Sequence, residues 1–524
     1  MTGYARVRGN DWGVLAPPPP GAWAPECTVS VIIPAYNCQE FVDLALAALA
    51  RQTYPARLLE VVVADDGSEP KIELPDLAPE HSRVVRVPDH STGWGRANAL
   101  HVGAMASEGE ILHWLDADLV PFPHHVEAQA RWHHVAPDAV TLGYKRFVSG
   151  GPWPTPQEVA SGPVEQLFPV ERTEPHGYVE EFIAATDGLR AADHLAFRAH
   201  VGATAALRRD LYLAAGGLRT QLKLGEDSEF GYRLAQAGAV FVPEPAAGSW
   251  HLGPSNMMRD GQALRRYNRP FLADLMAQPR WLRGNAPGRG WQVPLVTAVV
   301  RAEGRLEHVR DSVDRLLASD ERDLQVLLEG DWEALSDGRH RVLDDPLLDL
   351  RLLAATYAGD PRVHLVTRAP DSAFPSPYLL RVPVGAGIGP RTVREIVAYA
   401  DEHHLGLLRV LPPGAGEGVV PPVIELWRTA AVMRAQRVLS DSELLPEAVA
   451  SVWGASWVDG DHVSVSDPVS GDAARTATGS SKPAPVPVAG VRSLVKATGL
   501  VARLAARRAG RRLRRPFAPA GRGP

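Results

Sequence analysis

The stretch Ile111-Leu112-His113-Trp114-Leu115-Asp116-Ala117-Asp118 is an apolar run that ends in an Asp-x-Asp pair. A short apolar run of this kind is typical of a buried strand. Ligands of open α/β sheets bind beyond the carboxyl ends of the strands, which is where this run places its two acids. Buried carboxylates need a compensating cation or hydrogen bonds, and hard divalent cations prefer carboxylate and phosphate oxygens. The run therefore predicts an α/β fold with a metal–diphosphate site, although solvated loop residues or a helix cap would also explain the pair.

The residues before this run predict a strand–helix–strand unit. Val29 to Ile33 is a β-branched run that stops at a proline, and apolar residues at helical spacing follow from Phe41 to Leu49. A second apolar run, Leu59 to Val63, closes in Asp65-Asp66-Gly67-Ser68. This order predicts a parallel, doubly wound sheet. Asp66 could accept a hydrogen bond from a nucleoside there, or it could simply belong to an Asp-Gly turn.

Six segments follow one another in an order that one enzyme family shares: VSVIIPAYN, VVVADDGS, GRANALHVG, GEILHWLDAD, GEDSEFGYRL and SWH. In these segments the chain resembles the nucleotide-sugar half of a family 2 glycosyltransferase with the GT-A fold, and the resemblance extends over about residues 27–255. The resemblance implies a Rossmann-like, mostly parallel sheet and a nucleotide-sugar donor, with UDP as the expected nucleotide. It also implies an inverting transfer to an acceptor hydroxyl.

The resemblance implies roles for individual residues on the donor side. Tyr36 would lie against the base, and Pro34 belongs to the same donor-binding set. Asp66 would accept the uracil N3–H, and Arg96 would lie near the diphosphate.

The metal and the base are implied in the same way. Asp118 would bind Mn²⁺ or Mg²⁺ directly, and Asp116 would face the ribose or a metal-bound water. His251 would be a further ligand, since neutral imidazole binds borderline cations, but it could equally be a structural histidine. Asp227, beside Glu226, would be the catalytic base, and the same two acids would also complement a helix dipole. A metal that neutralises the leaving diphosphate and one base that activates the acceptor suit an inverting reaction.

The second half of the chain repeats the order of strand and helix patterns seen in the first. Residues 294–300, 309–317 and 324–331 look like the first strand, helix and strand again, and Arg428 to Arg434 is similar to Ala203 to Arg209. The apolar run 405–413 occupies the expected place of the Asp-x-Asp strand but lacks both acids. We predict a degenerate, GT-A-like α/β domain over 292–465 that positions the acceptor or serves as a scaffold, although many α/β domains share such a rhythm.

The ends of the chain differ from its middle in composition. Residues 1–26 contain Pro17 to Pro20 and predict a flexible lead-in to a catalytic domain over 27–285. Residues 466–490 have a linker composition, and 491–524 carry ten Lys or Arg residues and no acid. Without these ten cations the net charge of −6 becomes −16. The tail predicts a basic amphipathic helix that binds an anionic membrane surface through 491–515, or a disordered tail without a partner.

Composition narrows the functional class. Two cysteines are too few for a disulfide framework or a zinc module, and no run approaches the ~20 apolar residues of a membrane helix. With no signal-peptide pattern, we predict a cytoplasmic protein, peripheral at the inner face of the plasma membrane if the tail binds there. Nucleic acid is not an expected partner, because the tail almost lacks stacking aromatics. The expected acceptor is an unidentified glycan or lipid-linked sugar in envelope or other glycan synthesis.

Two other classes compete with this interpretation. One is a catalytically inactive scaffold that binds nucleotide sugars, which the acids at positions 66, 118 and 227 argue against. The other is a nucleotidyltransferase, which would carry a Gly-rich loop with a lysine where residues 33–37 have none.

Overall fold

The computed structural model describes residues 4–88, 93–284, 289–336, 338–339, 341–412, 423–439 and 443–466. These residues belong to one compact unit, 1–469. Apart from residue 466, the predicted linker and the basic tail lie outside the described residues, so the expectations for them stay predictions. Within the described residues no helix is long and apolar enough to span a membrane.

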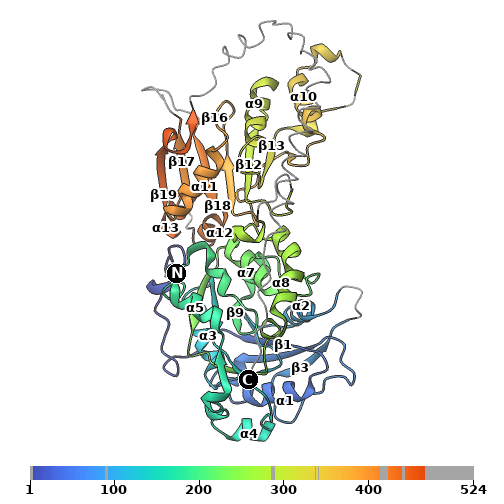
Figure 1. Ribbon diagram of the computed structural model, residues 1–524, viewed down its shortest axis with the longest axis vertical. Coiled ribbons are helices and arrows are strands. Elements are labelled where there is room, and N and C mark those ends of the chain that lie inside the picture. The colour runs from blue at the N-terminus through green and yellow to red at the C-terminus, as the bar shows by residue number, and fades with distance from the viewer. Residues whose placement is uncertain are drawn as a thin grey trace, which may run out of the picture. The chain divides into compact units, whose positions relative to one another are not determined.

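Seven strands form the sheet of the first lobe, by which we mean residues 27–284. Their order is β10-β6-β9-β4-β1-β2-β3, and only β9 runs against its neighbours. The fold class predicted from the sequence, an α/β unit with a mostly parallel sheet, is therefore confirmed (Figure 1). The strands are β1 (Val29–Ala35), β2 (Leu59–Asp65), β3 (Ser82–Arg86), β4 (Ile111–Trp114), β6 (Ala139–Gly143), β9 (Ala205–Arg208) and β10 (Val240–Glu244).

Helices cover both faces of this sheet because alternate strand residues point to opposite sides. On one face, Val31 and Ile33 pack with residues of α1 (Gln39–Leu49) and α3 (His125–His133). On the other face, Ile32 packs with residues of α2 (Arg96–Ala106), α6 (Arg209–Ala214) and α7 (Glu226–Gln236). The remaining helices of this lobe are α4 (Pro156–Ser161), α5 (Gly177–Ala185) and α8 (Asn256–Leu275).

A second, small sheet lies at the carboxyl end of β4. It has the order β5-β11-β7-β8, formed by Leu119–Pro121, Ser249–Leu252, Arg146–Val148 and Thr173–Pro175. Because β5 begins immediately after Asp118 and pairs antiparallel with β11, His251 lies opposite Leu119. The small sheet therefore brings together residues more than a hundred positions apart at the edge where the acids lie.

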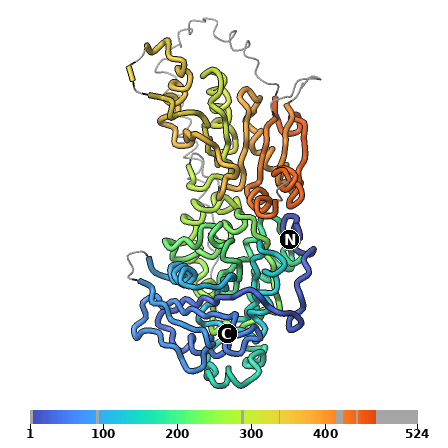
Figure 2. Tube along the Cα trace, turned by 180° about the vertical axis from the view of Figure 1, so that it is seen from behind, coloured from blue at the N-terminus to red at the C-terminus, as the bar shows by residue number. Residues whose placement is uncertain are grey.

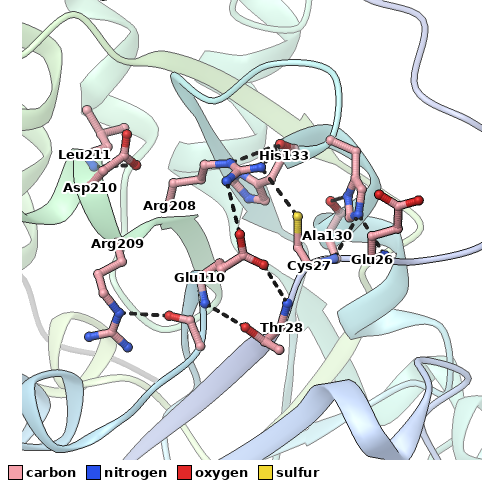
Figure 3. Close-up of polar contacts among 12 residues, drawn as sticks. Glu26, Cys27, Thr28, Glu110, Ala130, His133, Arg208, Arg209, Asp210 and Leu211 are labelled. Atoms are coloured by element: carbon pink, nitrogen blue, oxygen red, sulfur yellow. Dashed lines mark hydrogen bonds and ion pairs between the residues drawn. The ribbon is translucent and has the colours of Figure 1, made fainter.

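Polar contacts fix the opposite, amino-terminal ends of the strands (Figure 3). The Thr28 amide donates to Glu110 at 3.2 Å, and the Glu110 amide donates to the Thr28 hydroxyl at 3.0 Å. Arg208, at the end of the antiparallel β9, lies 3.8 Å from Glu110 and donates to the carbonyl of His133. These contacts tie β1, β4 and β9 in register, away from the ligand-binding edge.

The second lobe, residues 292–466, has a sheet of the same topology. Its order is β14-β13-β12-β15-β18-β17-β19, and only β18 runs against its neighbours. Strand for strand, this is the first sheet read from β3 to β10. The strands are β12 (Val296–Arg301), β13 (Leu324–Glu329), β14 (Val363–Val366), β15 (Tyr378–Arg381), β17 (Leu407–Leu411), β18 (Ile424–Arg428) and β19 (Ala455–Asp459), and β16 (Gly387–Ile388) pairs with β20 (Val465–Ser466).

The second lobe corrects one alignment made from the sequence. The counterpart of the Asp-x-Asp strand β4 is β15, since both are the parallel neighbours of the first strand of their lobe. The run 405–413, placed there from sequence, forms β17 and corresponds to β6. An apolar run predicts a buried strand but carries no information about which neighbours it pairs with. The helices of this lobe are α9 (Leu306–Leu317), α10 (Leu348–Tyr357), α11 (Thr392–Glu402), α12 (Thr429–Val438) and α13 (Leu445–Val452).

The amino-terminal segment is not the flexible lead-in that its prolines predicted. Val7 and Leu15 are buried, and the Asn10 side chain donates to the carbonyls of Leu189 and Phe241 at 3.0 Å. The Gly9 amide also bonds to the carbonyl of Val452 in α13 at 2.9 Å. Figure 2 shows this blue segment beside the red end of the second lobe. Apolar anchors before the proline run hold the segment in place, and composition alone did not reveal them.

Candidate functional site

A cleft of about 700 Å³ opens at the carboxyl ends of β1, β2 and β4. This volume is in the range of small-molecule sites. Six of the nine predicted site residues line it: Pro34, Tyr36, Asp66, Arg96, Asp116 and Asp118. Trp94, Cys38 and Phe41, which the sequence did not single out, complete much of the apolar wall. The parallel sheet explains this grouping, because the ends of adjacent parallel strands meet at one edge.

Asp66 has one oxygen engaged and one free. Its Oδ2 accepts a hydrogen bond from the Gly95 amide at 2.6 Å, which ties the end of β2 to the start of α2. Its Oδ1 is buried and has no partner among the described residues. Asp65 differs, because it accepts from the Ser68 amide and pairs with Arg86. A buried acceptor without a donor is costly, so the free oxygen of Asp66 marks a position where a ligand N–H would fit.

Arg96 connects the two halves of the site. Its Nε donates to Asp116 at 2.8 Å, Nη1 to Glu226 at 2.9 Å and Nη2 to the Gly202 carbonyl at 2.7 Å. Burial opposes ionisation of Asp116, but the charge and hydrogen bond of Arg96 outweigh it and hold the pKa of Asp116 below its ordinary value. Gly202 packs closely here, because a Cβ at this position would lie 3.0 Å from Arg96 and 3.3 Å from the Cβ of Asp227.

Asp118 and His251 face each other across the small sheet. His251 Nε2 lies 3.7 Å from an oxygen of Asp118. The Nδ1 of His251 lies 3.0 Å from the Gly253 carbonyl, which can only accept, so Nδ1 carries the hydrogen and Nε2 presents a lone pair. Burial lowers the pKa of His251, although the charge of Asp118 opposes the shift, and burial raises the pKa of Asp118. This tautomer is the one that a metal-binding histidine needs.

Two acids lie at the start of α7, and of these Glu226 is paired with Arg96 while Asp227 is not paired with a cation among the described residues. Glu226 is buried against Arg96, and burial raises its pKa, with Arg96 opposing and the nearby Asp227 adding to the rise. Asp227 accepts from its neighbour Ser228 at 2.7 Å, and its backbone carbonyl lies 2.8 Å from His200 Nδ1. Glu229 is paired with Arg219 and Arg233, so it belongs to the packing of the helix.

Lys145 is a site residue that the sequence did not reveal. It lies between β6 and β7 and is only 5% exposed. Burial lowers its pKa to about 8, although the charges of Asp116 and Asp227 oppose the shift. The only signal in the sequence is a Lys-Arg pair that follows an apolar strand, and nothing in that pattern places the lysine near acids from two other segments.

Comparison with known proteins assigns the first lobe to a family. The family model for glycosyl transferase family 2 matches residues 30–211. Chondroitin synthase from Escherichia coli is 24% identical over 363 residues, which cover 65% of this chain and 50% of that protein. Validoxylamine A glucosyltransferase from Streptomyces hygroscopicus subsp. limoneus is 34% identical over 128 residues, which cover 24% of this chain and 28% of that protein.

A solved structure, the mannosyltransferase PcManGT from Pyrobaculum calidifontis in complex with GDP-Man and Mn²⁺, aligns with 21% identity and a TM-score of 0.33. The alignment covers 52% of this chain and 68% of that one. The chain carries a family 2 glycosyltransferase domain, and the family predicted from the sequence motifs is confirmed. The chain spans half the length of the Escherichia coli relative and 28% of the Streptomyces one.

Proposed function

We propose that this protein transfers a sugar from a UDP donor to an acceptor hydroxyl, with inversion at the anomeric carbon. The free, buried oxygen of Asp66 carries the proposal. Asp66 lies in the wall of the cleft, and the imide N–H of uracil is the kind of donor that its free oxygen lacks. Tyr36, 62% exposed on the same wall, offers a ring against which the base would pack.

The residues present fit a divalent metal that shares its coordination with the donor. Within the described residues, no group of three or more His, Cys, Asp or Glu side chains is arranged to hold a metal. Asp118 and the Nε2 of His251 would supply two ligands, and diphosphate oxygens and water would complete the shell, as is common for Mg²⁺. Asp116 is already bound to Arg96, so we assign it to positioning. The metal, Mn²⁺ or Mg²⁺, would neutralise charge on the leaving diphosphate.

Asp227 is the proposed base. In a single displacement the acceptor oxygen forms a bond to the anomeric carbon, and the bond to the phosphate oxygen breaks with its electron pair. The hydroxyl proton passes to the Asp227 carboxylate. Glu226 and Arg96 hold the start of α7 against the donor side, because Arg96 bridges Glu226 and Asp116. One base with no second carboxylate placed as a nucleophile is what an inverting transfer requires.

The acceptor that we propose is a glycan. The similarity to a chondroitin synthase over half of that protein's length supports this class. The second lobe, which has no counterparts of Asp116 and Asp118, would position the acceptor.

Calorimetry tests the proposal. A panel of UDP-sugars is titrated into the wild type with Mn²⁺ and with chelator, and into Asp118→Ala. We expect metal-dependent binding that the Asp118 variant loses. Asp331→Ala is the control, because it removes an acid from the cleft of the second lobe. If no nucleotide sugar binds the folded protein, the scaffold interpretation replaces this one.

A further inference from the structure

Two cations lie near the cleft, and among the described residues only one of them has hydrogen-bond or ion-pair partners. Each of the three nitrogens of Arg96 donates to a protein acceptor, and two of these acceptors are carboxylates. Two carboxylates offset its charge, and three of its five N–H groups hold Asp116, Glu226 and Gly202 together. Arg96 also lines the cleft, so the expectation that it lies near the diphosphate stays a prediction.

Lys145 is in the opposite situation. In the part of the chain that the structure describes, no hydrogen bond or ion pair engages its ammonium group, and only 5% of the residue is exposed. The nearest aromatic ring, that of Phe147, lies 6.0 Å from Nζ. Burial of the side chain holds the ammonium group in one place, while the group itself keeps its hydrogen-bond donors free. A fixed cation with free donors is suited to bind an anionic ligand.

The backbone holds Lys145 in place on both sides. The Gly143 amide donates to the Thr204 carbonyl at 3.1 Å, and the Tyr144 amide donates to the Ala247 carbonyl at 2.9 Å. Beyond the lysine, Arg146 begins β7, which pairs in parallel with β11. The strand that carries His251 therefore also fixes Lys145. This lysine is not a mobile surface residue, because its position is set by the same small sheet that sets the proposed metal ligand.

Lys145 lies near acids that belong to both sides of the proposed site. The carboxylates of Asp116, Asp118 and Asp227 all act electrostatically on its ammonium group. Asp118 belongs to the proposed metal side, whereas Asp227 belongs to the acceptor side. Its nearer neighbour is the metal side, because the Phe147 ring, 6.0 Å from Nζ, packs against His251 with the ring centroids 4.6 Å apart.

We propose that the ammonium group of Lys145 binds the oxygens of the departing diphosphate. The inference rests on the proposed transfer. When the bond from the anomeric carbon to the phosphate oxygen breaks, the electron pair stays on that oxygen, and Lys145 donates a hydrogen bond to it while keeping its own proton. A nucleoside diphosphate leaves with more charge than one divalent cation offsets, particularly where that cation is also bound by Asp118. Lys145 supplies the remaining positive charge.

The test compares a nucleoside with its diphosphate. UDP and uridine are titrated with Mn²⁺ into the wild type, Lys145→Met and Lys145→Arg, with Lys71→Ala, an exposed lysine, as the control. Methionine keeps the length of the side chain and removes its charge, and thermal unfolding verifies that each variant folds. We expect Lys145→Met to weaken UDP binding about 10- to 100-fold and to leave uridine binding unchanged. Lys145→Arg should recover part of the loss, and Lys71→Ala should match the wild type.

Four outcomes would count against the proposal. UDP affinity of Lys145→Met within twofold of the wild type would overturn it. Equal losses for UDP and uridine would also overturn it, because they would indicate a structural role. Unchanged UDP affinity with a raised KM for the acceptor would assign the lysine to an acidic acceptor instead. A wild type that binds no UDP would overturn the proposed function itself, and the inference with it.

Discussion

The two lobes share one strand order but differ at the edge where ligands bind. In the first lobe, Val29 pairs with Leu59 and Ile111, and in the second, Val296 pairs with Leu324 and Tyr378. Counting along the strands from these pairs equates positions in the two lobes. Asp66 corresponds to Asp331, whereas Asp116 and Asp118 correspond to Pro383 and Gly385. The same backbone topology therefore carries the Asp-x-Asp pair in the first lobe only, while an acid at the end of the second strand is present in both.

The second lobe also differs in the helices that carry the other site residues. No helix in the described residues lies between β14 and β15, where the first lobe has α2 with Arg96. The helix α13, which corresponds to α7, begins with Leu445 and Pro446 where α7 begins with Glu226 and Asp227. A cleft of about 520 Å³ persists at the ends of β12 and β13, with Asp331 in its wall. The comparison shows that the sheet makes the cleft, while a few loop and helix-end residues make the chemistry.

The largest expected effect is the loss of transfer in Asp118→Ala. Without this ligand the leaving diphosphate would lose metal stabilisation worth several kcal/mol, so kcat should fall roughly 10³-fold or more. Initial rates with saturating donor and Mn²⁺ measure this. Residual transfer near the wild-type rate would mean that the second lobe also catalyses, which would remove the distinction between the lobes.

Asp227→Asn should lower kcat about 10²–10⁴-fold, because the acceptor proton loses its base. Binding of UDP, measured by calorimetry, should stay at the wild-type value, since Asp227 lies outside the donor cleft. Loss of UDP affinity in this variant would contradict its assignment to the acceptor side. Glu447→Gln, in the first turn of α13, is the control in the second lobe and should change neither quantity.

Asp66→Ala should raise the KM for the donor about 10- to 100-fold and leave kcat near the wild-type value. The variant removes one charged hydrogen bond to the base, which contributes about 1.5–3 kcal/mol. Asp331→Ala at the matching position should leave the KM for the donor unchanged. Equal effects of the two substitutions would indicate that both clefts bind the donor.

A smaller effect concerns the stability of the fold at low pH, because the lobes bury different numbers of histidines. The first lobe buries His113, His125 and His133 in its core, whereas the described histidines of the second lobe are exposed. Burial lowers the pKa of His133 from 6.5 to about 3. Below pH 6.5 the unfolded chain takes up a proton that the folded chain refuses, so stability falls as the pH drops from 6.5 toward 3. The free energy of unfolding should fall by about 1.4 kcal/mol per pH unit for each such histidine.

Urea unfolding of the wild type, His133→Phe and His364→Phe between pH 7 and pH 5 tests this expectation. His133→Phe should have a shallower pH dependence, because one titrating group has been removed from the core. His364→Phe, on the surface of the second lobe, should keep the wild-type slope. An unchanged slope for His133→Phe would show that this histidine takes up its proton in the folded state.

Much of the first lobe could be predicted from the sequence. The β-branched run at Val29 and the apolar run at Ile111 give the strands, and the pairing at one sheet edge brings Asp66 and Asp118 to one cleft. The second lobe was harder to align, because β15 and β17 are both short apolar runs and only hydrogen-bond pairing separates them. The amino-terminal segment was misjudged, since the proline run at 17–20 is plain in the sequence and the docking of Val7 and Asn10 is not.

The sequence by itself determined the strand–helix rhythm, the family and the acids that end the strands, because these depend on local periodicity and on residues near one another in the chain. The tertiary structure decided which of these groups are available. Only the packing shows that Arg96 donates hydrogen bonds to Asp116, Glu226 and Gly202. It also shows that one oxygen of Asp66 has no donor, and that the buried Lys145 has no partner among the described residues. Burial and hydrogen-bond satisfaction depend on neighbours that are distant in sequence, and no local pattern encodes them.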